Sequence, residues 1–143
     1  MNSETTPSDN STTSSSADLA ILVVDDVFAA RRIMSRFLEK LGFTNIAQAE
    51  TGSSALAVLA GGNIQLVICD LHLTDMTGIE LFRAMQKDAE SSNTPFMIVT
   101  SDGDRQEFEE ARQVGIANYL LKPFDQAALK AKIKETLEMS KAV

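Results

Sequence analysis

The sequence predicts an α/β protein built on a five-stranded parallel sheet with helices on both faces. Two observations support this fold class. Five short apolar segments alternate along the chain with five amphipathic ones, which is typical of strand-helix repeats and a parallel sheet. The apolar segments are nearly continuous, as expected for strands that are covered on both sides.

Each element is recognised by its own pattern. The strands are short apolar runs, at residues 20–24, 45–49, 66–69, 96–99 and 117–121. The helices carry apolar residues at helical spacing, at residues 27–41, 53–60, 78–87, 105–114 and from Asp125 to about Met139. Right-handed crossovers and five strands favour the order 2-1-3-4-5, which is the flavodoxin-like arrangement.

The first helix has Ile33, Phe37 and Leu41 four residues apart, which predicts that these side chains share one face. Gly42 is its expected C-terminal stop. The inward faces of two later helices are predicted to consist of Ile79, Phe82 and Met85, and of Leu129, Ile133 and Leu137.

Helix start signals support the later boundaries. Asp104 and Glu107 have the spacing of a capping box at the start of the fourth helix. Asp125 can cap the last helix in the same way, through its side-chain oxygen.

Composition predicts one domain with polar ends. The length of 143 residues suits a single domain, which we place at residues 18–139. Residues 1–17 are rich in Ser and Thr and are expected to form a disordered tail, with a short second tail at residues 140–143. The single cysteine, Cys69, excludes an internal disulfide and is expected to be a buried core residue.

Charge and hydropathy restrict the partners. The net charge of −7 argues against direct binding to nucleic acid or to an anionic membrane. No run is long and apolar enough to span a membrane, and the N-terminus lacks the pattern of a secretory signal. These features together predict a cytoplasmic protein.

Polar residues follow four of the five predicted strands. Asp25 and Asp26 follow the first, Asp70 the third, Thr100 the fourth and Lys122 the fifth. Asp70 alone could simply begin a turn. In an open parallel sheet, however, ligands bind beyond the carboxyl ends of the strands, and the predicted strand order brings these ends together. The five side chains are therefore expected to share one crevice.

The charges of this set indicate its chemistry. Three neighbouring carboxylates repel one another, and Lys122 alone does not neutralise them. A hard divalent cation that prefers oxygen ligands, namely Mg²⁺, would do so. The cation and Lys122 would together accommodate a phosphoryl group, and the Thr100 hydroxyl could donate to it. A carboxylate can serve as the nucleophile. Asp70 is the candidate, because it follows the third strand, which is central in the predicted order.

The chain resembles the receiver domain of two-component response regulators, and most closely the single-domain chemotaxis (CheY-like) type. The resemblance covers about residues 19–137, and its motifs in this fixed order are highly specific. They are Val23-Val24-Asp25-Asp26, Asp70 followed by Gly78, Val99-Thr100 and Tyr119-Leu120-Leu121-Lys122-Pro123-Phe124.

The resemblance implies a role for each matching position. The implied metal ligands are Asp25, Asp26, Asp70 and the backbone carbonyl of His72, with Asp26 the direct ligand. Asp70 is the implied phosphoacceptor, and Thr100 and Lys122 contact the phosphoryl group. Thr100 and Tyr119 are the implied switch residues, and the peptide bond between Lys122 and Pro123 is expected to be cis.

The resemblance also implies partners. A histidine kinase or a phosphotransfer protein would supply the phosphoryl group. A downstream target protein or a fused output domain would read the changed surface of the helix at 105–114, the strand at 117–121 and the last helix. Such a domain is not an enzyme, although it assists its own phosphorylation and dephosphorylation.

Two positions depart from the family pattern. Thr74 stands where many members have a proline four residues after the phosphoacceptor, which leaves the shape of this loop less defined. His72 stands two residues after the phosphoacceptor. It is either an exposed loop residue or a group whose bulk or charge changes the lifetime of the phosphoryl group.

Three alternatives remain at this point. Residues 70–74 (DLHLT) faintly resemble the DxDxT motif of haloacid-dehalogenase-like phosphatases, but His72 replaces the second Asp of that motif. A flavodoxin-like cofactor module would need a phosphate-binding loop after the first strand, where residues 25–28 (DDVF) would repel phosphate. A degenerate receiver would act only as an interaction module, which does not explain the complete set of acidic, Thr and Lys residues.

Overall fold

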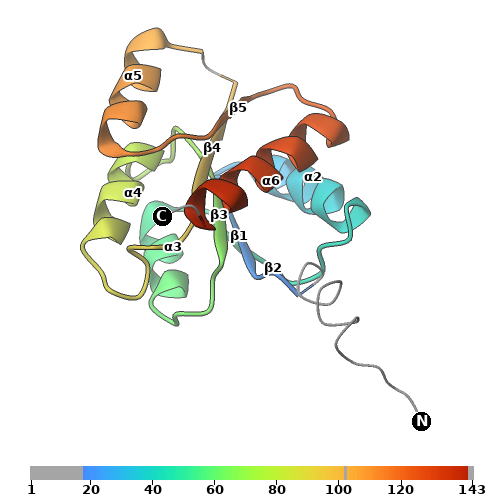
Figure 1. The fold of residues 1–143 in the computed structure, drawn as a ribbon, viewed down its shortest axis with the longest axis horizontal. Helices are drawn as coiled ribbons and strands as arrows, with labels where there is room; N and C mark the ends of the chain where they lie inside the picture. Colours follow the sequence, from blue (N-terminus) through green and yellow to red (C-terminus); the bar gives the residue numbers. More distant parts are fainter. Residues whose placement is uncertain (1–17, 102, 142–143) are drawn as a thin grey trace.

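The computed structural model describes residues 18–101 and 103–141, and it contains all ten predicted elements (Figure 1). The strands are β1 (Ile21–Val24), β2 (Ile46–Ala49), β3 (Leu66–Asp70), β4 (Phe96–Thr100) and β5 (Tyr119–Leu121). The helices are α2 (Phe28–Lys40), α3 (Gly52–Leu59), α4 (Gly78–Gln86), α5 (Arg105–Val114) and α6 (Gln126–Lys141). The predicted tail at residues 1–17 lies outside the described residues.

The five strands form one parallel sheet in the order β2-β1-β3-β4-β5, which confirms the predicted topology. The register pairs Val24 of β1 with Cys69 of β3, and Thr100 of β4 with Leu121 of β5. The carboxyl ends of β1, β3, β4 and β5 therefore lie side by side along one edge of the sheet.

Helices cover both faces of the sheet (Figure 1). One core lies under α2 and α6, and the other under α3, α4 and α5. Leu66 and Ile68 of β3 face the first core, whereas Val67 and Cys69 face the second. Because successive side chains of a strand point to opposite faces, an apolar run of this kind is needed to fill two cores.

The face that Ile33, Phe37 and Leu41 share is not the buried face of α2, because Ile33 is 57% exposed. The buried side chains of α2 are instead Arg31, Met34, Ser35 and Leu38. Their spacing of three and four residues follows the turn of a helix, whereas three residues spaced four apart drift around it. Phe37 and Leu41 therefore lie at the border of the core, and Ile33 lies beyond it.

The later predictions of helix faces are confirmed, and so are the caps at Asp104 and Asp125. Of the predicted capping box, the Asp104 half is observed, whereas Oε1 of Glu107 lies 3.3 Å from Nε2 of His72. Both predicted apolar faces pack into the cores, through Ile79, Phe82, Met85, Leu129, Ile133 and Leu137. The carboxylate of Asp104 accepts hydrogen bonds from the first-turn N–H groups of α5, and that of Asp125 accepts one from Ala128 N at 2.8 Å. These bonds satisfy N–H groups that have no partner within the helix.

Within residues 18–101 and 103–141, none of the helices has both the length and the apolar character needed to cross a membrane. The cytoplasmic location stays a prediction.

Candidate functional site

Three carboxylates meet at the edge of the sheet, at the ends of β1 and β3. Asp25, Asp26 and Asp70 each offer one oxygen, and these oxygens all lie within 4.8 Å of one another. Asp25 is only 6% exposed, Asp70 is partly buried, and Asp26 is more open to solvent than Asp25. The prediction that the sheet brings these three residues together is therefore confirmed.

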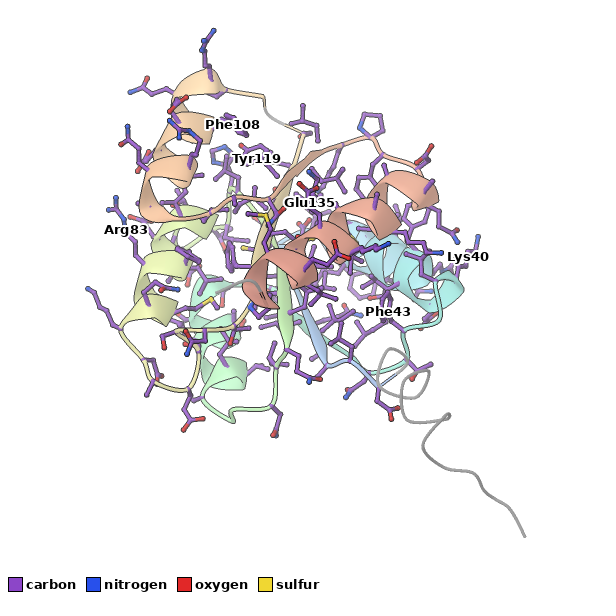
Figure 2. The ribbon with its side chains drawn as sticks, viewed as in Figure 1. Lys40, Phe43, Arg83, Phe108, Tyr119 and Glu135 are labelled. Carbon is purple, nitrogen blue, oxygen red and sulfur yellow. The ribbon has the colours of Figure 1, made fainter. Side chains whose placement is uncertain are left out.

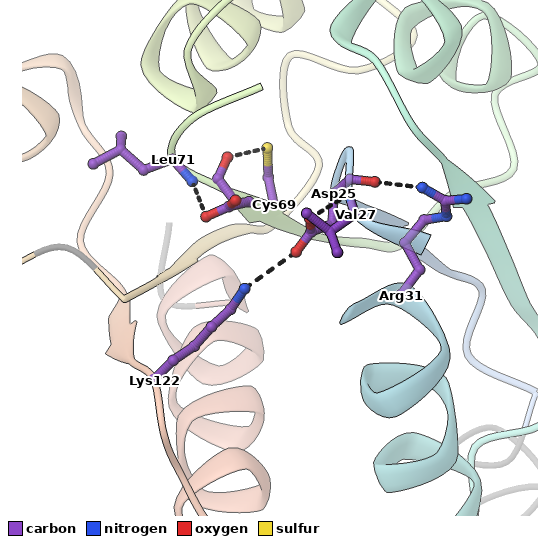
Figure 3. A network of polar contacts seen from close by, with 7 residues as sticks. Asp25, Val27, Arg31, Cys69, Leu71 and Lys122 are labelled. Atoms are coloured by element: carbon purple, nitrogen blue, oxygen red, sulfur yellow. Dashed lines mark hydrogen bonds and ion pairs between the residues drawn. The ribbon is translucent and has the colours of Figure 1, made fainter. Parts of the chain in front are cut away.

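Asp25 is held by contacts on both of its carboxylate oxygens (Figure 3). Oδ1 accepts a hydrogen bond from the backbone N–H of Val27 at 2.9 Å, and Oδ2 lies 3.2 Å from Nζ of Lys122. Lys122 thus reaches the acidic cluster from β5, as predicted, and places one positive charge against three carboxylates.

Asp70 ends β3 and accepts a hydrogen bond from the backbone N–H of Leu71 at 2.9 Å (Figure 3). Burial raises the pKa of the Asp70 carboxyl, and the charges of Asp25 and Asp26 raise it further, while the ammonium of Lys122 and the Leu71 N–H lower it. The net result is a pKa of Asp70 above its usual range, with burial as the largest cause.

Cys69 lies directly beneath this site. It is fully buried, and its Sγ donates to the backbone carbonyl of Asp70 at 3.0 Å. Burial and the neighbouring carboxylates raise the pKa of its thiol, so Cys69 is a core residue, as predicted.

Thr100 is the last residue of β4, and Lys122 directly follows the adjacent strand β5. Thr100 is 2% exposed at the end of β4, and its backbone carbonyl accepts a hydrogen bond from Lys122 N at 2.8 Å. The next peptide bond, between Lys122 and Pro123, is cis, as expected from the family resemblance. The sheet therefore places both residues at the same edge as the carboxylates.

Arg31 is a residue of this region that sequence reasoning missed. It is 9% exposed on α2, and its Nη1 donates to the backbone carbonyl of Asp25 at 2.6 Å (Figure 3). Its Nε donates to Oε1 of Gln48 on β2 at 3.2 Å. The only signal in the sequence was an arginine three residues before Met34, on the same face of the helix.

The loop after Asp70 is held at several points despite Thr74. Leu73 N donates to Met76 O at 3.1 Å, and the carboxylate of Asp75 accepts from the backbone N–H groups of Gly52 and Ser53 at 2.8 and 2.9 Å. The hydrogen bond from the N–H of Gly52, followed in size of effect by the one from Ser53, holds the pKa of Asp75 below its usual range. A carboxylate at the N-terminus of α3 thus anchors the loop.

His72 lies in this loop with its side chain 48% exposed, and it forms an isolated antiparallel bridge with Thr77. Its Nε2 lies 3.3 Å from Oε1 of Glu107 on α5. The histidine is therefore exposed, as one of the two interpretations held, but it also contacts the neighbouring helix.

Tyr119 lies on β5 and packs against Phe108 of α5 (Figure 2). The ring centroids are 4.8 Å apart and the rings are nearly perpendicular, at 83°. The Tyr119 hydroxyl oxygen is buried, whereas Phe108 is 44% exposed. The aromatic pair thus connects β5 to a helix on the surface.

An apolar cavity of about 260 Å³ adjoins the acidic cluster, between α2 and the segment that follows β5. Its wall includes Ile33, Phe37, Pro123 and Phe124, with Asp25, Asp70 and Lys122 at the polar end. Ile33 is therefore part of the surface beside the site rather than part of the core.

A 2-1-3-4-5 parallel sheet with an acidic cluster and a lysine at its carboxyl edge is the arrangement of phosphorylation-dependent signalling domains. That is the class of protein that the fold and the site define. The family model described as "Response regulator receiver domain" matches residues 21–134, and the chain belongs to this family. Members of this family are signalling switches rather than enzymes, which decides against the phosphatase alternative.

Similar proteins agree with this assignment. The chain is 40% identical over 120 residues to the chemotaxis protein CheY of Pseudomonas aeruginosa, covering 84% of this chain and 97% of the relative. It is 36% identical over 121 residues to the chemotaxis protein CheY-3 of Vibrio cholerae, covering 85% and 93%. The solved structure of the chemotaxis response regulator CheY4 of Vibrio cholerae has a TM-score of 0.76 at 27% identity, covering 84% and 99%.

Proposed function

We propose that Asp70 is the phosphoacceptor of this receiver domain. Phosphorylation of Asp70 switches the surface formed by α5, β5 and α6. The observation that carries the proposal is the meeting of three carboxylates and the Lys122 ammonium at one edge of the sheet. Such a charge change at a site biases an element that has two arrangements.

The acidic cluster fits a magnesium ion. Its donors are hard carboxylate oxygens within 4.8 Å of one another, and a single ammonium leaves an excess of negative charge. Asp25, Asp26, Asp70 and the backbone carbonyl of His72 would hold the ion, and Asp26 would contact it directly. When bound, Mg²⁺ neutralises negative charge on the carboxylates and on the phosphoryl oxygens.

The carboxylate of Asp70 forms the new bond to phosphorus, and the leaving group departs with the electron pair of the bond that breaks. The Lys122 ammonium lowers the pKa of Asp70 and so favours the ionised form that attacks. The same ammonium is a point charge for one phosphoryl oxygen, and the Thr100 hydroxyl donates to another.

The switch consists of Thr100 and Tyr119. Thr100 ends β4 beside Lys122, and Tyr119 on β5 packs against Phe108 of α5. A movement of Thr100 toward the phosphoryl group changes the space beside β5, and Tyr119 transmits that change to α5.

Membership of the family implies a histidine kinase as partner. A histidine kinase or a phosphotransfer protein supplies the phosphoryl group, and a target protein or a fused output domain reads the switched surface. Because the curated relatives are named as chemotaxis proteins, chemotaxis signalling is the process we propose. Direct contact with nucleic acid or a membrane is not part of this function.

The test is the intact mass of the protein after incubation with acetyl phosphate, with and without Mg²⁺. We expect a Mg²⁺-dependent gain of one phosphoryl group in the wild type, slow hydrolysis of the adduct, and no gain in Asp70→Asn. The absence of an adduct under every condition would contradict the proposal and favour an interaction module. Fast release of phosphate without an accumulating adduct would contradict it in favour of phosphatase chemistry.

A further inference from the structure

Arg31 is buried in the first turn of α2, behind the acidic cluster, and makes no contact that the proposed phosphorylation uses directly. We propose that Arg31 is a positioning residue, which holds the turn formed by Asp25 and Asp26 in the geometry that binds a divalent cation. The inference rests on the proposed function, because it concerns the site at which Mg²⁺ is proposed to bind.

The guanidinium joins two elements that the chain does not join directly. Nη1 donates to the backbone carbonyl of Asp25 at 2.6 Å, and Nε donates to Oε1 of Gln48 on β2 at 3.2 Å. The amide of Gln48 is fixed in turn, because its Nε2 donates to Oγ of buried Ser35 at 3.2 Å. Asp25 N also donates to Ala49 O of β2 at 3.1 Å. The backbone N–H of Asp25 is therefore bonded to β2 directly, and its backbone carbonyl is linked to β2 through Arg31.

The direction of the Asp26 carboxylate depends on the backbone of this turn more than the direction of the Asp25 carboxylate does. The carboxylate of Asp25 has its own partners, Val27 N and the Lys122 ammonium. No hydrogen bond or ion pair joins the Asp26 carboxylate to another side chain or N–H group in the described part of the chain, 18–101 and 103–141. The direction of the Asp26 carboxylate is therefore set by the turn, and Arg31 holds the carbonyl that enters that turn.

This position requires the guanidinium group of an arginine. Its planar guanidinium donates along fixed directions to two acceptors at once, whereas the ammonium of a lysine is a single point. Phe28 covers the guanidinium on the outside, with Cζ of Arg31 lying 5.5 Å from the ring centroid. Arg32, the next residue, provides a matched comparison, because its Cζ lies 5.9 Å from the same ring but it is exposed.

The experiment compares Arg31→Met, Arg31→Lys and the control Arg32→Met, which removes the same charge from the same helix. The first readout is the dissociation constant of Mg²⁺, measured by calorimetry on the full chain, and the second is the thermal midpoint in metal-free buffer. We expect Arg31→Met to weaken Mg²⁺ binding about 10-fold, as loss of a group that orients metal ligands typically does. Arg31→Lys should restore only part of the affinity, and Arg32→Met should bind as the wild type does.

Gln48→Met keeps the test decisive if Arg31→Met does not fold. It leaves the arginine in place but removes the acceptor that orients it, so it should weaken Mg²⁺ binding in the same direction and by less. Wild-type affinity in Arg31→Met, or in both Arg31→Lys and Gln48→Met, would overturn the role of Arg31. An equal loss in Arg32→Met would also overturn it, because general charge would then explain the effect. A wild type that does not bind Mg²⁺ would instead overturn the proposed metal site, and this inference with it.

Discussion

The ammonium of Lys122 lies 3.2 Å from Oδ2 of Asp25, although 97 residues separate the two along the chain. The contact brings the end of β5 to the end of β1 and places a cation at the cluster of three carboxylates. In the proposed function Lys122 has two opposing effects, because its ammonium would compete with a cation at the cluster but would also be a point charge for a phosphoryl oxygen.

Lys122→Met should separate these two effects. Without the ammonium, the carboxylates attract a cation more strongly, so Mg²⁺ binding should tighten. The phosphoryl group loses a point charge, so the rate of phosphorylation by acetyl phosphate should fall on the order of 100-fold at saturating Mg²⁺. Calorimetry and a time course of intact mass measure the two quantities. Weaker Mg²⁺ binding would show instead that Lys122 is needed to organise the ligands.

Asp70→Asn should stabilise the metal-free protein at neutral pH by about 1 kcal/mol, because the ionised carboxylate is partly buried and lies beside the charges of Asp25 and Asp26. The folded state raises the pKa of Asp70, so the ionised form costs stability. Relative to Asp70→Asn, the wild type should lose stability as the pH rises from about 4 through the raised pKa. Urea unfolding across this range measures the difference, which should vanish below pH 4. A difference that does not change with pH would exclude ionisation as its cause.

Asp75→Ala should release the loop after Asp70 from α3, because it removes the acceptor of the Gly52 and Ser53 N–H groups. Hydrogen exchange of these two amides should become faster, while amides of β4 stay protected. The folded state lowers the pKa of Asp75, so the anchor is present above the unfolded pKa of about 4 and is lost as the pH falls through the lower folded value. Asp75→Asn, which keeps one acceptor without the charge, should be intermediate. Unchanged exchange in Asp75→Ala would refute the anchor.

Gly78→Ala should destabilise the protein by about 1–3 kcal/mol, the usual cost of overpacking. A Cβ at Gly78 would lie 2.8 Å from Cδ1 of Ile98 and 2.9 Å from the backbone oxygen of Asp70, which cannot move without disturbing β3. Gly103→Ala is the matched control, because no other atom of residues 18–101 and 103–141 lies within 4 Å of its added Cβ, its chain neighbours aside. Chemical unfolding measures both variants, and Gly78→Ala/Ile98→Val should recover only part of the loss. Equal stability of the two single variants would contradict this packing.

Sequence reasoning predicted the fold and most of the site because both follow from local patterns. The apolar run 66–69 had to be a strand covered on both faces, and β3 indeed supplies side chains to two cores. Once five such runs alternate with helices, parallel topology places the ends of the strands together, so Asp25, Asp70 and Lys122 could be grouped without coordinates.

The sequence could not determine the contacts between different helices, strands and loops, because no local sequence pattern links the residues that make them. The face that α2 buries was decided by packing, which left Ile33 on the surface beside the site. The bond from Arg31 to Asp25 and the anchor from Asp75 to Gly52 join groups whose distance depends on how helices and strands pack. The sequence by itself determined which residues reach the carboxyl edge of the sheet, because strand periodicity and chain order define that edge. Only the tertiary structure decided what holds them there, because hydrogen bonds between elements need positions and directions that no local spacing contains.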